Sequence, residues 1–224
     1  MDLTEVMKTT FAAREFTDEP VDDATLFRIL DQARFAPSGG NRQPWKVVVV
    51  KDAEKRKRAA EAAEPTFRRY MAQVVAGENP WNTIEPTKLT PEEIANGPDP
   101  AGYLASIVSA PAVLVVFADL RVIASFDSEQ DRVGVISGAS IYPFVWNVLL
   151  AARNEGLGGT LTTFVGGADA EVQAIFGMAD YMVPAALLPI GRPVKQLTKL
   201  KRNGVDEIAT IDHADGPRLS EPGD

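Results

Sequence analysis

The amino-acid sequence predicts a single α/β-type domain, and three features support this fold class. Short apolar runs typical of buried strands, such as 47–50 and 111–118, are mixed with amphipathic helical patterns. No break in composition and no internal repeat divides the chain. A length of 224 residues with a hydrophobic fraction of 45% is sufficient for one sizeable core. We therefore expect one domain over residues 1–224.

The first part of the chain predicts two helices separated by an irregular segment. Apolar residues at helical spacing indicate a short helix over 3–10, and 11–21 is expected to be irregular. Asp22 or Asp23 can cap a second helix, which Pro37 ends.

The next part predicts a strand, a helix and a long irregular segment. The turn 38–41 leads into the valine run 47–50, which is typical of a buried strand, and 53–64 is an alanine-rich, charged helix. Segment 77–102 is rich in glycine, proline and asparagine, so a lid or binding loop is one interpretation. A surface insertion explains it equally well.

The second half of the chain contains more strands and two helices. A helix is expected over 137–155, ended by Gly156, and Asp169 is expected to cap a helix that runs to Phe176. Segment 214–224 is a polar tail. The predicted strands are 111–118, 158–164 (a strand or an extended loop), 183–190 and 206–211.

Composition excludes several kinds of chemistry. The chain has no cysteine, so it can form no disulfide, thiolate metal site or cysteine nucleophile. The chain has one histidine, His213, which argues against a histidine-based catalytic triad and against a zinc site built from several histidines. We therefore expect no metal.

The balance of charges limits the classes of partner that the protein is expected to bind. Twenty-three basic and thirty-one acidic residues give a net charge of −8, which argues against binding to nucleic acid or to an anionic membrane. No apolar run is long enough to span a bilayer, and the N-terminus lacks a signal-peptide pattern. We expect a cytoplasmic protein in which any anionic ligand meets a local group of basic residues.

The most informative stretch is 36–45, Ala-Pro-Ser-Gly-Gly-Asn-Arg-Gln-Pro-Trp. Its glycines allow close approach of a ligand to the backbone, and Ser38, Asn41 and Gln43 offer hydrogen-bonding groups. An ordinary helix-to-strand turn uses the same residue types. Neither a Gly-x-Gly-x-x-Gly motif nor a Walker motif is present, which argues against a Rossmann or P-loop site.

Four blocks, in order along nearly the whole chain, resemble the flavin-dependent nitroreductase family. They are Arg14-x-Phe16-x-x-x-Pro20-Val21, the 36–45 stretch, Leu149-Leu150-Ala151-Ala152-Arg153-x-Glu155-Gly156-Leu157-Gly158 and Leu188-Pro189-Ile190-Gly191-x-Pro193. The 36–45 block is the most specific of the four.

The resemblance implies a fold, a cofactor and a reaction. The fold is α+β, a mostly antiparallel sheet flanked by helices in an intertwined homodimer, often with an exchanged C-terminal strand. Two FMN molecules lie at the subunit interface. Hydride passes from NADH or NADPH through the flavin to a nitroaromatic, quinone or similar small acceptor by ping-pong turnover, with the cofactor supplying the chemistry.

The resemblance also implies which residues bind FMN. Family members place basic and hydroxyl groups around the phosphate, but Phe11 and Ala12 stand at those positions here, so Arg14 and Arg202 must carry the binding. Arg192 is a weaker candidate. The remaining predicted contacts are Pro37, Ser38, Gly39, Asn41 and Gln43 in the first loop, and Thr162, Thr163 and Phe164 beside the flavin ring.

The resemblance assigns no certain catalytic side chain, because flavin N5 performs the chemistry. Thr163 or Thr162 is hypothesised to form a hydrogen bond with N5, by analogy with the related iodotyrosine deiodinases. Strand propensity explains the two threonines as well.

Two alternative functions remain open at this point. The altered phosphate motif suggests a protein that stores FMN with little turnover. A reductive dehalogenase of the same fold would need a lid with Glu, Tyr and Lys, and Glu64, Tyr70 and Lys88 match that pattern poorly. Segment 77–102 is expected to cover the flavin. Its Trp81, together with Phe67, Tyr70 and Met71, would suit stacking on aromatic acceptors, although core packing explains single aromatic residues as well.

Overall fold

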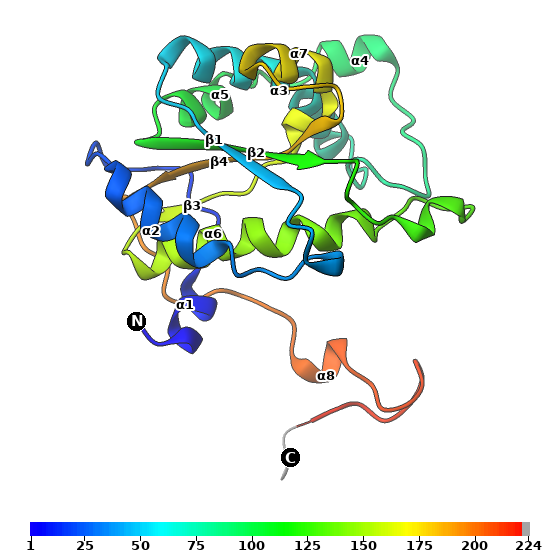
Figure 1. Ribbon diagram of the computed structural model, residues 1–224. Coiled ribbons are helices and arrows are strands. Elements are labelled where there is room, and N and C mark those ends of the chain that lie inside the picture. Colours follow the sequence, from blue (N-terminus) through cyan, green and yellow to red (C-terminus); the bar gives the residue numbers. More distant parts are fainter. Residues whose placement is uncertain (221–224) are drawn as a thin grey trace.

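The centre of the molecule is a four-stranded antiparallel sheet in the order β1-β2-β4-β3, seen in a computed structural model that describes residues 1–220 (Figure 1). The strands are β1 (Trp45–Val49), β2 (Ala112–Asp119), β3 (Gly158–Gly159) and β4 (Met182–Gly191). The α+β class with an antiparallel sheet is therefore confirmed. Residues 221–224 of the predicted tail 214–224 lie outside the described residues.

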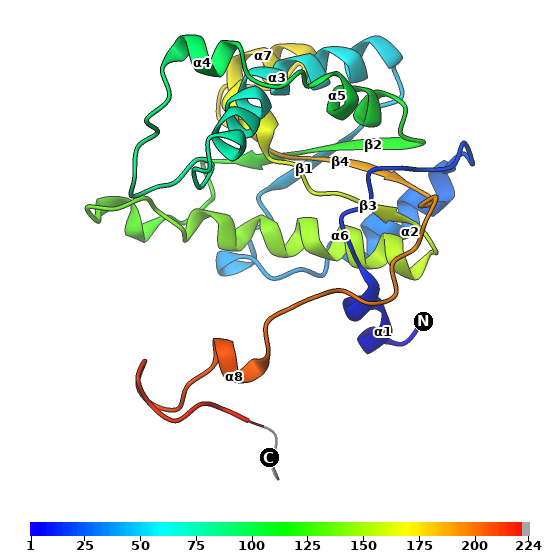
Figure 2. The same ribbon diagram turned by 180° about the vertical axis from the view of Figure 1, so that it is seen from behind.

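Helices cover both faces of the sheet. On one face lie α2 (Asp23–Ala33) and α6 (Tyr142–Asn154), with α1 (Leu3–Thr9) beyond them. On the other face lie α3 (Ala53–Val75), α4 (Pro91–Ala95), α5 (Ala101–Val108) and α7 (Asp169–Phe176) (Figures 1 and 2). The C-terminal arm, which carries α8 (Val205–Ile208), runs away from these layers.

The core consists of two apolar layers separated by the sheet. Alternate residues of β2 belong to different layers: Leu114 and Val116 pack with α2 and α6, while Val115 and Phe117 pack with α3 and α7. Because both faces are covered, β2 is buried along almost its whole length. This explains a continuous apolar run in an antiparallel strand, where one solvated face is common.

Several predicted helices are confirmed. Asp22 is the cap of α2, since its Oδ1 accepts a hydrogen bond of 2.7 Å from the backbone N–H of Thr25. Gly156, with φ of 78°, ends α6 as expected. Among residues 1–220, no helix combines the length and apolar character that crossing a membrane requires.

Two of the predicted helix boundaries in the second half were wrong. The helix predicted over 137–155 begins at Tyr142, because 137–140 forms a separate 3₁₀ turn and Pro143 occupies the first turn of α6. Asp169 is the first residue of α7 and makes no capping hydrogen bond; Ala168 holds the cap position.

Helix α3 also differs from its prediction over 53–64. It continues through Pro65 to Val75, although proline removes a helical hydrogen bond. Its second half packs against the rest of the domain, where Phe67 and Tyr70 contact the ring of Phe164 edge-on. Tertiary contacts therefore outweigh the local helix-breaking signal.

Two predicted strands also need correction. The run 47–50 is not fully buried, because β1 is an edge strand and Val47 to Val49 are half-exposed. Segment 158–164, expected as a strand or an extended loop, is a strand at Gly158 and Gly159 and then a loop in which Thr162 forms a single bridge to Leu187. Segment 206–211 is not a strand: 205–208 is the helix α8, whose first turn is closed by a hydrogen bond from Gly204 N–H to Glu207.

Candidate functional site

The turn between α2 and β1 is held by its own polar side chains. Ser38 Oγ accepts a hydrogen bond of 2.9 Å from Gln43 N–H, and Gln43 Nε2 donates to Asn41 Oδ1 over 3.2 Å. Asn41 and Gln43 have φ of 53° and 49°, a left-handed conformation that is uncommon outside glycine. Such local strain is concentrated at functional sites, which supports a role beyond connection.

This turn is attached to the beginning of α6. Gly39 N–H donates to Ser140 Oγ over 3.0 Å, two residues before the helix starts. Of the residues predicted to bind flavin, Pro37, Gly39, Asn41 and Gln43 are exposed and Ser38 is half-buried. The structure therefore brings these five residues together.

Arg14 lies in a different part of the chain's surface. The neighbouring Ala13 N–H donates to Gly159 O over 3.0 Å, which holds this segment beside β3. Arg14 is exposed, and its Nη1 makes one long bond of 3.4 Å, to Ala12 O. It forms no ion pair with another described residue, so its positive charge is free to bind an anion.

Thr162 and Thr163 differ in what they can offer a ligand. Thr162 is buried: its backbone N–H donates to Leu187 O over 3.1 Å, and its Oγ1 shares a hydrogen bond of 2.7 Å with the Tyr103 hydroxyl. Thr163 is exposed, and neither its N–H nor its hydroxyl is bonded to a described residue. Thr163 is thus the better placed of the two to contact flavin.

Tyr103 was missed by sequence reasoning. It stacks on Phe67 with 4.0 Å between ring centroids, and burial raises the pKa of its hydroxyl to about 12. The phenol is therefore neutral near pH 7 and serves as a fixed partner of Thr162. A tyrosine in an otherwise apolar helix was the available signal, because a buried hydroxyl needs a partner.

The predicted flavin-binding residues form two separate groups within one chain. The 37–43 turn is bonded to Ser140, just before α6, while the segment of Arg14 is bonded to Gly159 of β3, which packs beside the Leu149 side chain of α6. Ser140 and Leu149 are nine residues apart, which is about 14 Å along a helix. The two groups are therefore held by different elements of the chain, and a ligand that contacts both must span this distance.

Arg202 is separate from both groups. It lies on the C-terminal arm, is exposed and donates to the adjacent Lys201 O over 2.7 Å. Nearer the body, the arm is held by a hydrogen bond of 2.9 Å from Gln196 Nε2 to Thr9 O. Arg192, in contrast, is ion-paired with Glu19 and is not free to bind phosphate.

A cavity of about 480 Å³ opens beside Thr163 and Phe164. Segment 77–102 supplies Pro80 and Trp81 to its wall, so part of this segment lies beside Thr163 and Phe164. The cavity's other lining residues are Thr66, Tyr70, Gly166 and Gly167. Of the residues suggested for a deiodinase-type lid, Glu64 is engaged by Arg68 at 2.6 Å.

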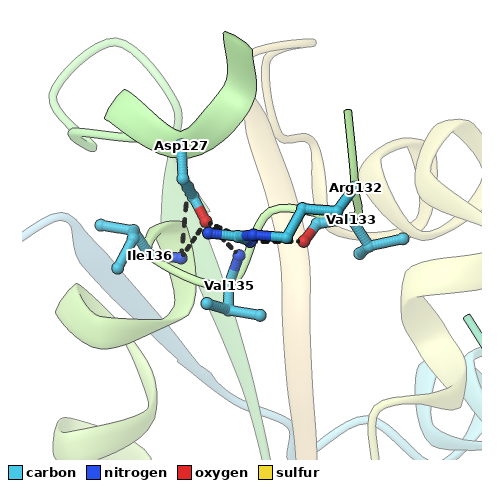
Figure 3. A network of polar contacts seen from close by, with 5 residues as sticks. All are labelled: Asp127, Arg132, Val133, Val135 and Ile136. Atoms are coloured by element: carbon cyan, nitrogen blue, oxygen red, sulfur yellow. Dashed lines mark hydrogen bonds and ion pairs between the residues drawn. The ribbon is translucent and has the colours of Figure 1, made fainter. Parts of the chain in front are cut away.

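A wider apolar groove, of about 910 Å³, lies along the start of α6. Tyr142 and Trp146, one helical turn apart, line it and are each 41% exposed. The loop on its border is organised by Asp127, which is only 3% exposed (Figure 3). Asp127 Oδ2 accepts from Val135 N–H at 2.7 Å and from Arg132 Nη1 at 3.0 Å.

The first prediction concerns this loop. The Val135 N–H and the Arg132 guanidinium hold the pKa of Asp127 below its usual value, so the carboxylate contributes stability above its unfolded-state pKa of about 3.9. Asp127→Asn will lower the melting temperature at pH 7, and the difference from wild type will shrink as pH falls through the lowered pKa. Thermal melts between pH 7 and pH 3 measure this.

The control is Asp131→Asn, an exposed position in the same loop, which will melt like wild type. A deficit for Asp127→Asn that stays constant down to pH 3 would show that the carboxylate charge is not the stabilising feature.

Comparison with known proteins gives a consistent result. Residues 8–192 match the model of the nitroreductase family. The chain is 24% identical over 199 residues to a putative NADH dehydrogenase/NAD(P)H nitroreductase of Methanothermobacter thermautotrophicus, covering 87% of this chain and 79% of that protein.

Two further proteins extend the comparison. An FMN and NADPH-dependent nitroreductase from Sphigopyxis sp. strain HMH superposes with a TM-score of 0.63 and 25% identity, over 93% of this chain and 98% of that chain. Iodotyrosine deiodinase 1 of Rattus norvegicus is 26% identical over 91% of this chain and 67% of that protein.

Proposed function

Because the chain belongs to the nitroreductase family, an FMN-dependent NAD(P)H oxidoreductase activity follows, and we propose that its acceptor is a nitroaromatic, a quinone or a similar small molecule. The observation that carries the proposal is the family match over residues 8–192. This range includes every predicted flavin-contacting residue except Arg202. FMN, when bound, supplies hydride acceptance from NADH or NADPH and two-electron delivery to the acceptor in a ping-pong cycle.

The free groups of this chain fit FMN when two protomers contribute. Arg14 has a guanidinium without a carboxylate partner, which suits the phosphate. Thr163 has an unengaged N–H and hydroxyl beside a cavity, which suits a polar edge of the flavin ring. The 37–43 turn, which is held at Ser140 before α6 rather than beside β3, would contact the flavin of the partner protomer.

These residues have distinct expected roles. Arg14 and Arg202 bind the phosphate, while Ser38, Asn41 and Gln43 orient the ribityl chain and ring across the interface. Thr163 directs a hydrogen bond to N5. Tyr103 keeps the Thr162 side chain in place and leaves Thr163 as the free donor.

The proposal is tested by the colour and kinetics of the purified protein. The expected result is a yellow dimer whose flavin absorbance is bleached by NADH or NADPH and restored by a nitroaromatic or a quinone. Bound FMN that responds to neither nicotinamide would favour the storage function instead. Colourless protein that takes up no FMN would contradict both.

Reductive dehalogenation is a weaker candidate for this chain. It is favoured by the similarity to iodotyrosine deiodinase 1. However, the Glu64 carboxylate is already paired with Arg68, and Lys88 contributes its backbone N–H to Glu78. Release of iodide from iodotyrosine by the reduced protein would establish this reaction.

A second prediction concerns Thr163. Thr163→Val removes the hydroxyl at nearly constant volume. Electron density increases at N5 during reduction, so the loss of one hydrogen bond to N5 will slow flavin reduction about three- to tenfold. Stopped-flow absorbance with NADPH or NADH measures this rate at full FMN occupancy.

Thr162→Val is the matched comparison. Its hydroxyl is bonded to Tyr103, so this change will lower the melting temperature and slow flavin reduction less than Thr163→Val does. A larger rate loss for Thr162→Val would assign the contact with N5 to Thr162 instead.

A further inference from the structure

Trp81 forms a rigid wall of the cavity beside Thr163. Its backbone N–H donates to Gln73 Oε1 over 3.1 Å, and its indole Nε1–H donates to Thr66 O over 3.3 Å. Gln73 is itself only 2% exposed and donates to Glu78 Oε2 over 3.0 Å. The indole is therefore held in place from two sides.

The backbone at Trp81 is strained. Its φ of 53° lies in the left-handed region, where a bulky side chain is a true outlier. Strain of this kind persists only where the surroundings enforce it and is found most often at binding and active sites. Because Trp81 lies on the cavity wall, this strained backbone conformation presents the indole ring to a ligand.

Arg69 places a positive charge against this wall. Its guanidinium carbon lies 4.0 Å from the centroid of the Trp81 ring, in a cation–π contact. Arg69 Nε is buried and has no hydrogen-bond partner among residues 1–220, and no described carboxylate forms an ion pair with Arg69. Its neighbour Arg68, in contrast, is neutralised by Glu64.

The cavity itself carries no charge. Its walls are the aromatic rings of Tyr70, Trp81 and Phe164 together with small residues and Thr66 and Thr163. In a chain with 31 acidic residues, no carboxylate lines this cavity. A ligand here meets flat apolar surfaces and a nearby positive charge that the protein leaves unpaired.

We propose that this cavity selects flat aromatic acceptors that carry a negative charge, such as a ring carboxylate or phenolate, with Trp81 as the stacking wall and Arg69 as the source of charge preference. The proposal rests on the proposed oxidoreductase function, because the cavity borders the predicted flavin contact Thr163. An electron-accepting ring stacks on the aromatic walls, and its anionic substituent is attracted by the unpaired guanidinium, which contacts the Trp81 wall without itself lining the cavity.

The test uses the FMN-loaded protein and two acceptors of nearly equal shape, 4-nitrobenzoate and neutral 4-nitrobenzamide. The wild type will prefer the anion in kcat/KM, and the preference will weaken with added salt. Arg69→Met keeps an unbranched apolar stem against Trp81 and will reduce the ratio of the two kcat/KM values about tenfold, while Arg69→Lys will retain most of it.

Binding without turnover gives an independent readout. Isothermal titration of the FMN-loaded protein with benzoate and with benzamide will show tighter binding of benzoate to wild type, and this difference will disappear in Arg69→Met. Arg58→Gln is the charge-matched control. It removes one exposed arginine of α3 eleven residues away, about 16 Å along the helix, and will behave like wild type.

Several outcomes would overturn the proposal. An unchanged ratio in Arg69→Met, or an equal loss in Arg69→Lys and Arg69→Met, would show that the charge of Arg69 does not select acceptors. The proposed function would stand in both cases, provided that 4-nitrobenzamide is still reduced. Protein without flavin, or without reduction of either acceptor, would instead contradict the proposed function.

Discussion

Replacing Arg14 and Arg202 together by alanine will give a folded protein that is purified without FMN. Each charge-assisted hydrogen bond to a phosphate contributes roughly 1.5–3 kcal/mol, so loss of both will raise the Kd for FMN about 10²- to 10⁴-fold. The ratio of flavin to protein absorbance, followed by titration of the apo-protein with FMN, measures the loss.

The local structure explains why no neighbouring group will compensate. Phe11 and Ala12 offer no polar side chain to a phosphate beside Arg14. The hydroxyls of Thr9 and Thr10 donate instead to the carbonyls of Glu5 and Val6, each over 2.7 Å. The phosphate site therefore depends on few residues in a chain with a net charge of −8.

The control for this experiment is the double variant Lys55→Ala/Arg58→Ala. Both side chains are exposed on α3, and their removal changes the net charge by the same amount. This protein will retain FMN. Full FMN occupancy in Arg14→Ala/Arg202→Ala would place the phosphate elsewhere on the chain.

Trp146→Asp will give a monomeric protein that lacks flavin. Trp146 lies on α6 in an apolar groove and is 41% exposed, while its neighbours Phe144 and Val145 are buried on the inner side of the helix. A large half-exposed aromatic residue in such a groove is typical of an interface core. Two buried, unpaired carboxylates per dimer would cost roughly 3–5 kcal/mol each and weaken association at least about 10⁴-fold.

Loss of flavin is expected because the proposed site uses groups from two chains. The 37–43 turn is bonded to Ser140 before α6 and the Arg14 segment to Gly159 of β3, so on this proposal a monomer offers only part of the contacts. Sedimentation velocity and the flavin absorbance of the same sample measure both effects. Trp146→Phe keeps an apolar ring and will remain dimeric and yellow.

The outcome that would contradict this prediction is a monomer that retains FMN at full occupancy. It would show that one chain holds the whole flavin site, and the assignment of the 37–43 turn to the partner's flavin would be wrong. If Trp146→Asp leaves the dimer intact, the interface does not include this groove.

The sequence predicted most elements correctly where local patterns and packing agree. Asp22 caps α2 and Gly156 ends α6 because cap chemistry acts over only a few residues. The prediction failed at α3, which continues past Pro65 because its second half packs on the domain, and at 206–211, where a local hydrogen bond from Gly204 to Glu207 closes a helical turn. The apolar residues Val205, Ile208 and Ile211 are spaced three apart, which suits a helical turn better than the alternation of a strand.

The candidate site was predictable as a set of residues but not as an arrangement. The 36–45 block and the two threonines were visible in the sequence, but the engagement of Thr162 by Tyr103 joins residues 59 positions apart. The contact between Arg69 and Trp81 likewise depends on how the 77–102 segment packs on α3. Side-chain contacts of this kind depend on tertiary packing, which no local pattern encodes.

The sequence by itself determined the family, the absence of cysteine chemistry and the few basic residues available for a phosphate, because these depend on residue identity and order. Only the tertiary structure decided that the Thr162 hydroxyl is bonded to Tyr103 while Thr163 is free, that the predicted flavin-binding residues are held by different elements, and that Arg69 lies unpaired against Trp81. The physical reason is that burial and hydrogen-bond partners are properties of the packed chain, set by contacts between residues far apart in sequence.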